Sequence, residues 1–239
     1  MICLMVKKLA KERNFMFVEH QEFKSPELPR VGMVTGSVNM DQLGKFKSKL
    51  RILVGREIVE NEVFVSNVKP KKFKQKHLRV LDLSFDTTSD SPVSSKNWLH
   101  GMVGSLPNLT CLKIGSSSLT CFPKSLMHLS NLETLCLLRC RQLKELPSEI
   151  SHLQKLTVLD VTSCFSPFFL PAQITRLTNL EILYGFMPSK LKGHCSMSGL
   201  KELSHRLRKL RIRIDSEDQF DKDELKVKGG KMRHATPAS

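Results

Sequence analysis

Seven cysteines are the residues of this sequence best suited to metal or redox chemistry. Cys136 and Cys140 are close enough in the chain to suggest a shared metal ion. Zinc ligands, however, must converge to about 2.3 Å from the metal. The surrounding apolar pattern places Cys136 at an outward position of a strand and Cys140 at an inward turn, so the two thiols point apart. We therefore predict structural cysteines and no metal site.

Two histidines, His128 and His152, are 24 residues apart, and Arg176 follows at the next equivalent position. Because arginine replaces histidine there, we interpret all three as one solvated position of a repeat. No Ser/His/Asp arrangement and no paired carboxylates stand out. Gly44-Lys45-Phe46 lacks the flanking residues of a phosphate-binding G-x-x-x-x-G-K-[ST] loop. The sequence therefore predicts a non-catalytic protein that needs no cofactor and no metal.

These residues lie within a repeat that determines where each side chain points. Its apolar residues are Leu132, Leu135, Leu137, Cys140, Leu143, Leu146, Ile150 and Leu153. The pattern restarts at Leu156, and prolines at 123, 147 and 171 give two successive intervals of 24 residues. A fixed period of this size with this spacing is the signature of a leucine-rich repeat.

Each repeat unit divides into two halves. The first half, as in Leu132–Leu137, alternates like a short strand with leucines inward. The second half spaces apolar residues three apart after a proline, which suits a helical or 3₁₀ turn. One unit cannot bury its leucines alone, so units must stack. The predicted fold class is an α/β repeat solenoid, a leucine-rich-repeat horseshoe with a parallel concave sheet and short helical or 3₁₀ convex turns.

Three regions follow from this pattern. Residues 1–49 are predicted to be an N-terminal helix and linker, with prolines and glycines marking a loop over 21–36. Residues 50–214 are predicted to hold about 7 repeats, most regular at 78–184. Residues 215–239 show no periodicity and are expected to be a disordered tail.

The formal charge of +15 raises the question of a nucleic-acid partner. The regular repeats at 78–180 carry 9 Lys and Arg against 7 Asp and Glu, whereas residues 1–77 carry 16 against 8. The basic excess therefore flanks the organised part, and no nucleic-acid-binding motif is present, which disfavours such a partner.

No segment approaches the ~18 consecutive apolar residues that a membrane span needs. The opening apolar run is followed at once by Lys7 and Lys8, unlike a secretory signal. The odd number of cysteines does not suggest a disulfide framework. We expect no membrane partner and a cytoplasmic location, with the nucleus as an alternative.

The outward strand residues are the best candidates for a function. Equivalent residues of parallel strands stack ~4.8 Å apart and form columns on the concave sheet. The predicted central column is Asp82, Lys113, Cys136, Asp160, Tyr184 and Arg211. One neighbouring column is Val80, Cys111, Thr134, Val158, Ile182 and Lys209. The other is Ser84, Gly115, Leu138, Thr162, Phe186 and Arg213.

These columns combine apolar side chains with arginine at positions that folding does not require to be apolar, which is typical of protein-binding surfaces. The alternative is that these side chains pack against flanking segments of the same chain. The predicted binding residues are Asp82, Lys113, Thr134, Cys136, Leu138, Val158, Asp160, Ile182, Tyr184, Phe186, Arg211 and Arg213.

The repeat form Leu-Pro-x-x-Ile-x-x-Leu, with Cys140 and Cys164 at the turns, resembles cytoplasmic plant repeats. It is similar to the leucine-rich-repeat region of plant nucleotide-binding leucine-rich-repeat disease-resistance proteins. The run from Leu78 to Ser84, LRVLDLS, is a common entry into the main array of that family. The opening MICLM is similar to the segment beginning Met-His-Asp-Leu that closes the nucleotide-binding module, but Ile2 and Cys3 replace its His and Asp.

The resemblance covers residues 1–215 and implies a truncated form without the nucleotide-binding core. It implies a protein-recognition and regulatory module in plant defence, either recognising an effector or holding an immune receptor inactive. Its implied partners are a pathogen effector, a host guardee, or the NB-ARC or coiled-coil domains of a receptor. The alternatives are an intracellular scaffold in another pathway, such as a Ras-type adaptor, and nucleic-acid binding through residues 69–79 and 206–213.

Overall fold

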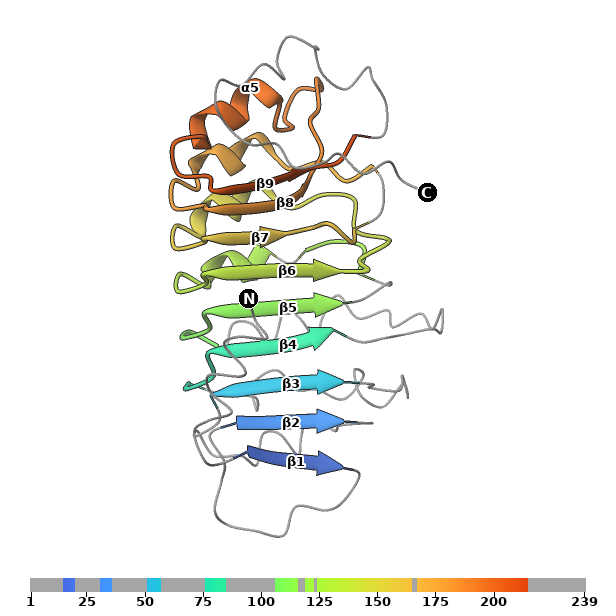
Figure 1. Ribbon diagram of the computed structural model, residues 1–239, viewed down its shortest axis with the longest axis vertical. Coiled ribbons are helices and arrows are strands. Elements are labelled where there is room, and N and C mark those ends of the chain that lie inside the picture. Colours follow the sequence, from blue (N-terminus) through green and yellow to red (C-terminus); the bar gives the residue numbers. More distant parts are fainter. Residues whose placement is uncertain are drawn as a thin grey trace.

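The computed structural model describes the backbone of residues 15–19, 31–35, 51–56, 76–84, 106–115, 119–122, 124–164 and 167–214. Within these residues, nine parallel strands form one sheet in which each strand pairs with its neighbours in the sequence. They are β1 (Phe15–Glu19), β2 (Val31–Thr35), β3 (Ile52–Arg56), β4 (Val80–Ser84), β5 (Cys111–Gly115), β6 (Thr134–Leu138), β7 (Val158–Asp160), β8 (Ile182–Phe186) and β9 (Lys209–Ile212). Figure 1 shows them stacked as a ladder, with β1 at the bottom and β9 near the top. The predicted solenoid with a parallel sheet is therefore confirmed.

The core lies directly behind the sheet and is built from the leucines of the repeat. Leu81, Leu112, Leu135, Leu159 and Leu183 are partners in successive strands, and each is fully buried. Side chains alternate between the two faces of a strand, so a leucine at every second position commits one face to the core. The other face of the sheet carries the predicted columns of outward strand residues.

In the described residues, the convex side of the repeats that contain β5, β6 and β7 is made of short 3₁₀ helices, as predicted. They are η2 (Lys124–His128), η3 (Ser148–His152) and η4 (Ala172–Arg176), which begin at intervals of 24 residues. Pro147 and Pro171 cap η3 and η4 in an extended conformation. Proline fits there because the first amides of a helix have no partner within the helix. Ile150 and Ile174 are fully buried and attach these helices to the core.

Asparagine side chains tie consecutive repeats together just before the strands. Asn131 Nδ2 donates to the Pro107 carbonyl at 3.0 Å, and Asn179 Nδ2 donates to the Gln154 carbonyl at 2.8 Å. Lys155 occupies the equivalent position between them, and its Nζ donates to Asn131 Oδ1 at 2.7 Å. These bonds reinforce the backbone pairing and hold the column register.

The solenoid continues toward the N-terminus past the expected domain boundary at residue 50. Strands β1 and β2 belong to the same sheet as β3, in unshifted register. The loop expected over 21–36 therefore contains a strand at Val31–Thr35. Its glycine is compatible with a strand because the hydrogen bonds are made by the backbone. Residues 1–14 and 215–239, where a helix and a disordered tail are predicted, lie outside the described residues.

The irregular end of the solenoid carries the helices α5 (Met197–Leu200) and η5 (Lys201–Leu203). Ser196 caps α5 by accepting a hydrogen bond from the Gly199 amide at 3.1 Å. Met197, Leu200 and Leu203 are buried against the core. Among the described helices, none is long and apolar enough to cross a membrane.

Candidate protein-binding face

The central column exists as a ladder of paired residues. Asp82 pairs with Lys113, and the ladder continues through Cys136, Asp160, Tyr184 and Arg211 without a shift. The first neighbouring column, from Val80 to Lys209, is paired in the same way. The geometry of these two columns is therefore as the leucine pattern predicts. Their role in binding stays a prediction.

The lower part of the central column is an ion pair followed by a buried thiol. Lys113 Nζ lies 3.3 Å from Asp82 Oδ2, and the two side chains are 25% and 10% exposed. Cys136 is buried next to them. Burial, and then the nearby Asp160 carboxylate, raise the pKa of the Cys136 thiol to about 11. A thiol with such a pKa is not a nucleophile near neutral pH, so Cys136 serves packing.

The upper part of the central column is more accessible. The Arg211 guanidinium lies 4.9 Å from the centre of the Tyr184 ring. Such a cation–π contact contributes ~0.5–1 kcal/mol at exposed sites and fixes the arginine in place. Asp160 Oδ1, in the next strand, accepts a hydrogen bond from the Thr162 amide at 3.0 Å. A half-buried aromatic ring, an exposed arginine and an oriented carboxylate thus lie side by side.

The first neighbouring column is less exposed than the sequence suggests. Val158 is predicted to be exposed on the face, but it is buried, as are Val80 and Cys111. Strands are only ~4.8 Å apart, so side chains of adjacent strands shield one another. Thr134 and Ile182 are partly exposed and remain on the face. Burial raises the pKa of the Cys111 thiol to about 12, which makes it inert as well.

The third column is wrong at its upper end. Ser84, Gly115 and Leu138 are paired, but β7 ends at Asp160, so Thr162 lies in a turn. Phe186 is fully buried and pairs with Ile212 instead of Arg213. It therefore belongs to the core, not to the predicted face.

Gly185 causes this reversal. Its φ is +81°, and the register between β8 and β9 shifts at this residue. One extra residue in a strand reverses the alternation of faces beyond it. Arg213 is drawn toward the turn after β7, where its Nη1 donates to the Cys164 carbonyl at 2.9 Å. It is half-buried and is not displayed as predicted.

Without the residues that are buried or turned away, the candidate binding face is a mixed polar and apolar surface. Its accessible or partly accessible members are Lys113, Thr134, Leu138, Asp160, Ile182, Tyr184 and Arg211. Within the part of the chain that the structure describes, no three His, Cys, Asp or Glu side chains are grouped to hold a metal ion. An aromatic residue and an arginine, two types that are enriched at protein interfaces, lie at its upper end.

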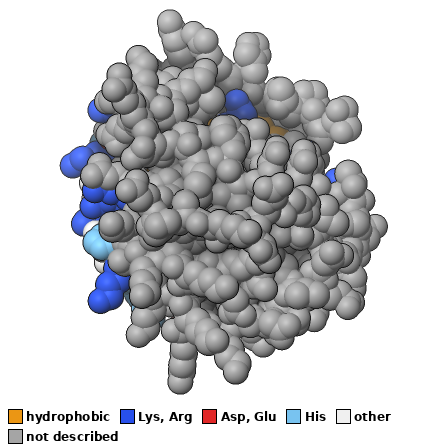
Figure 2. Space-filling view, turned by 90° about the horizontal axis from the view of Figure 1, so that it is seen from below, with side chains coloured by type: hydrophobic (Ala, Val, Ile, Leu, Met, Phe, Trp, Pro, Cys, Tyr) orange, Lys and Arg blue, Asp and Glu red, His pale blue; other side chains and the backbone are white. Residues whose placement is uncertain are grey.

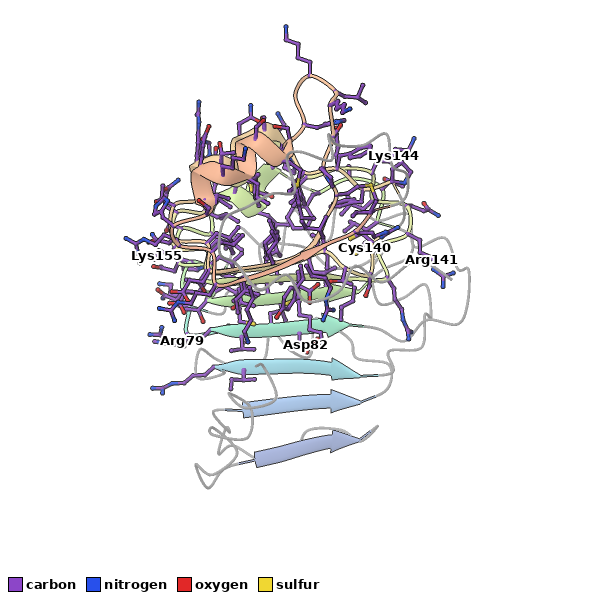
Figure 3. The ribbon with its side chains drawn as sticks, turned by 45° about the horizontal axis from the view of Figure 1, so that its top comes forward. Arg79, Asp82, Cys140, Arg141, Lys144 and Lys155 are labelled. Carbon is purple, nitrogen blue, oxygen red and sulfur yellow. The ribbon has the colours of Figure 1, made fainter. Side chains whose placement is uncertain are left out.

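The two lateral edges of the solenoid differ from this face. Arg51, Lys76, His77 and Arg79 are exposed just before β3 and β4. Figure 2, seen from below, shows Lys, Arg and His side chains along its left flank, and Figure 3 places Arg79 and Lys155 at the edge where the strands begin. This edge contains the described part of the basic segment 69–79.

At the opposite edge, where the strands end, sequence reasoning missed a pocket of about 920 Å³. Its lining residues are Thr120, Cys121, Arg141, Gln142, Leu143, Lys144, Glu145, Pro167, Phe169 and His194. They come from loops that follow four different strands. The one signal in the sequence is the insertion after β8, which breaks the 24-residue period and contributes His194.

Comparison with known proteins agrees with this architecture. A family model described as leucine-rich repeat region matches residues 59–233. The chain is 34% identical over 194 residues to Disease resistance RPP13-like protein 4 of Arabidopsis thaliana, covering 80% of this chain and 22% of that protein. The chain thus spans about a fifth of the length of the curated relative it matches.

Two solved structures have a chain path similar to that of this chain. The plant peptide hormone receptor RGFR1 in complex with RGF2 has a TM-score of 0.44 at 18% identity, covering 76% of this chain and 27% of the receptor chain. The PEPR1–AtPEP1 structure has a TM-score of 0.42 at 16% identity, covering 80% of this chain and 31% of the other.

Proposed function

This chain belongs to the leucine-rich repeat family, and from that premise we propose that it is a non-catalytic module that recognises another protein in plant defence. The similarity to a disease resistance protein of Arabidopsis thaliana supports the biological process. The sequence match to the repeat region supports protein recognition over catalysis, because such repeats offer an extended concave surface for binding.

The observation that carries the proposal is the upper part of the central column. Tyr184 and Arg211 are held together by the ring–guanidinium contact, and Asp160 lies on the adjacent strand. Tyrosine and arginine are enriched among the residues that dominate binding energies at protein interfaces. A pair already held in one conformation loses less side-chain entropy when a partner binds.

Two kinds of protein partner fit this face in the context of defence. One is a foreign effector or the host protein that it modifies. The other is the nucleotide-binding part of an immune receptor, which the module would hold inactive until a ligand shifts the equilibrium. We propose that either partner is met in the cytoplasm, where cysteines normally stay reduced, and the six cysteines of the described residues form no disulfide bond.

The test is a quantitative pull-down from plant extract with the tagged full chain and with the Tyr184→Ala/Arg211→Glu variant. We expect the variant to capture its specific partners at least about tenfold less, the size of effect expected when residues that dominate the binding energy of an interface are lost. The same comparison against the part of the Arabidopsis relative outside the matched region distinguishes an intramolecular partner from a foreign one.

A matched control is Arg176→Glu, which makes the same charge change at an exposed position of η4 on the convex side. This variant should capture the partners as the unchanged chain does. Equal capture by the Tyr184/Arg211 variant, with its circular dichroism unchanged, would show that the concave face is not the binding site.

A further inference from the structure

The pocket at the edge where the strands end is built by four consecutive repeats. Thr120 and Cys121 follow β5, residues 141–145 follow β6, Pro167 and Phe169 follow β7, and His194 follows β8. Figure 3 shows Arg141 and Lys144 at this edge, opposite Arg79 and Lys155. The pocket is therefore separate from the concave face and from the basic edge where the strands begin.

One wall of the pocket is aromatic. The rings of Phe169 and His194 are stacked, with centroids 4.9 Å apart and planes inclined by 17°. Backbone bridges fix both residues, Phe169 to Glu145 and His194 to Pro171. His194 Nδ1 also lies 3.2 Å from the Ser189 hydroxyl. The stacked rings are thus held in place before any ligand arrives.

The rim of the pocket carries more positive than negative charge. Arg141 and Lys144 are exposed, and among the described carboxylates only Glu145 lines the same pocket. No described carboxylate lies within salt-bridge distance of either cation. Arginine and lysine form charge-assisted hydrogen bonds with carboxylates, so these two exposed cations suit a partner that carries acidic residues.

An apolar side chain extends the site beyond the pocket. Leu191 is 63% exposed at the tip of the loop that leads to His194. The loop is closed by hydrogen bonds from the Leu191 amide to the Ser189 hydroxyl at 3.1 Å and from the His194 amide to the Leu191 carbonyl at 3.2 Å. Lys192, next to it, is exposed as well. The adjoining surface therefore continues the cationic and apolar character of the pocket.

We infer that this edge is a second docking site, which takes an acidic segment of a partner protein with one aromatic side chain in the pocket. The partner's ring would pack against the Phe169–His194 wall, where offset stacking is favourable. Its flanking carboxylates would meet Arg141 and Lys144. A peptide segment fits better than a small molecule, because Leu191 and Lys192 offer contacts outside the pocket that only an extended ligand can reach.

The test uses the full chain and a fluorescent peptide with glutamates on both sides of a central tryptophan, followed by fluorescence anisotropy. We expect saturable binding below about 1 mM. Arg141→Glu/Lys144→Glu should weaken it at least about tenfold, because close charge pairs are lost and replaced by repulsion. A peptide with serine in place of tryptophan should also bind more weakly.

The matched control is Lys76→Glu/Arg79→Glu, which makes the same charge change at the opposite edge. It should leave peptide binding unchanged, and so should Tyr184→Ala/Arg211→Glu on the concave face. If the Lys76/Arg79 control loses binding equally, the attraction is to net charge alone and the docking site is refuted. Because the concave-face variant is scored separately, failure of this site and failure of the proposed function are distinguishable.

Cys121 provides a readout that needs no change in the pocket. It is exposed in the pocket lining, whereas the other described cysteines are buried. In a Cys3→Ser background, we expect the tryptophan peptide to slow alkylation of Cys121 by iodoacetamide, and the serine peptide to slow it less. Unchanged alkylation at a peptide concentration that saturates the anisotropy signal would place the peptide elsewhere and overturn the inference.

Discussion

The repeats from β5 to β8 and the junction between β8 and β9 use the same leucine pattern with different results. In the first region the strands pair without a shift, and every expected inward leucine is buried. At the junction the register slips by one residue, so Phe186 enters the core and Ile212 becomes its partner. The difference shows that a leucine repeat keeps its register only while each strand keeps the same number of residues.

The register shift between β8 and β9 depends on the backbone conformation of Gly185 rather than on side-chain polarity. Gly185 has a φ of +81°, and a Cβ built on it would lie 2.6 Å from the Thr162 amide nitrogen. Only glycine adopts this conformation at little cost and leaves room for the neighbouring turn. One residue therefore separates a region that sequence periodicity describes well from one that it does not.

The largest expected loss of stability comes from a substitution that compares core packing in the regular repeats with core packing at the irregular end. Leu159→Ala removes a fully buried leucine from the regular region and should cost about 2–5 kcal/mol of unfolding free energy. Leu210→Ala, at the half-buried equivalent position of β9, should cost no more than about 2 kcal/mol. Urea denaturation followed by circular dichroism measures both. Equal losses would mean that the irregular end is packed as tightly as the repeats.

A somewhat smaller loss of stability should follow from a substitution that disrupts the register shift between β8 and β9. Gly185→Ala combines a positive φ with a clash against the Thr162 backbone, and should destabilise the chain by about 1–3 kcal/mol. Gly193→Ala is the control, because its φ is +93° but no atom lies within 4 Å of the added Cβ. It should cost about 1 kcal/mol, the conformational term alone. If the two variants unfold at the same denaturant concentration, the close approach at Gly185 contributes nothing.

The smallest expected effect is a pH dependence on the convex side of the regular region. Lys124 Nζ lies 2.6 Å from Glu149 Oε1, and this hydrogen bond from Lys124, then a backbone hydrogen bond, lower the pKa of Glu149 from 4.5 to about 2. A lowered folded-state pKa stabilises the fold above the unfolded-state value, and this stabilisation is lost as pH falls toward the folded-state value.

Glu149→Gln cannot ionise, so its difference in Tm from the unchanged chain should shrink between about pH 5 and about pH 2. Thermal unfolding across this range measures it. Glu181→Gln at the irregular end is the comparison, because the Glu181–Arg208 pair is longer, at 3.7 Å, and should matter less. A constant difference for Glu149→Gln over the whole range would contradict the assignment.

Much of the candidate face could be predicted because the number of residues between equivalent leucines gives the register in which the strands stack. The positions of the leucines alone align Asp82 with Lys113 and Tyr184 with Arg211, and the strands pair in that register. Exposure was harder to predict, since Val158 is outward yet shielded by its neighbours. The strand at Val31–Thr35 was missed because its local sequence carries loop-forming residues and no leucine repeat.

The leucine period alone specifies the solenoid, because inward leucines at a fixed period can be buried only by stacking one unit on the next. It also determined the register of two columns, which follows from where the leucines fall in each strand. The departure of Phe186 and Arg213 from the face is visible only in the folded chain, since a positive φ at Gly185 reverses the alternation without changing the apolar pattern. Only the tertiary structure assembled the edge pocket, because loops of unequal length from four repeats meet there, and no spacing in the sequence records where a loop folds.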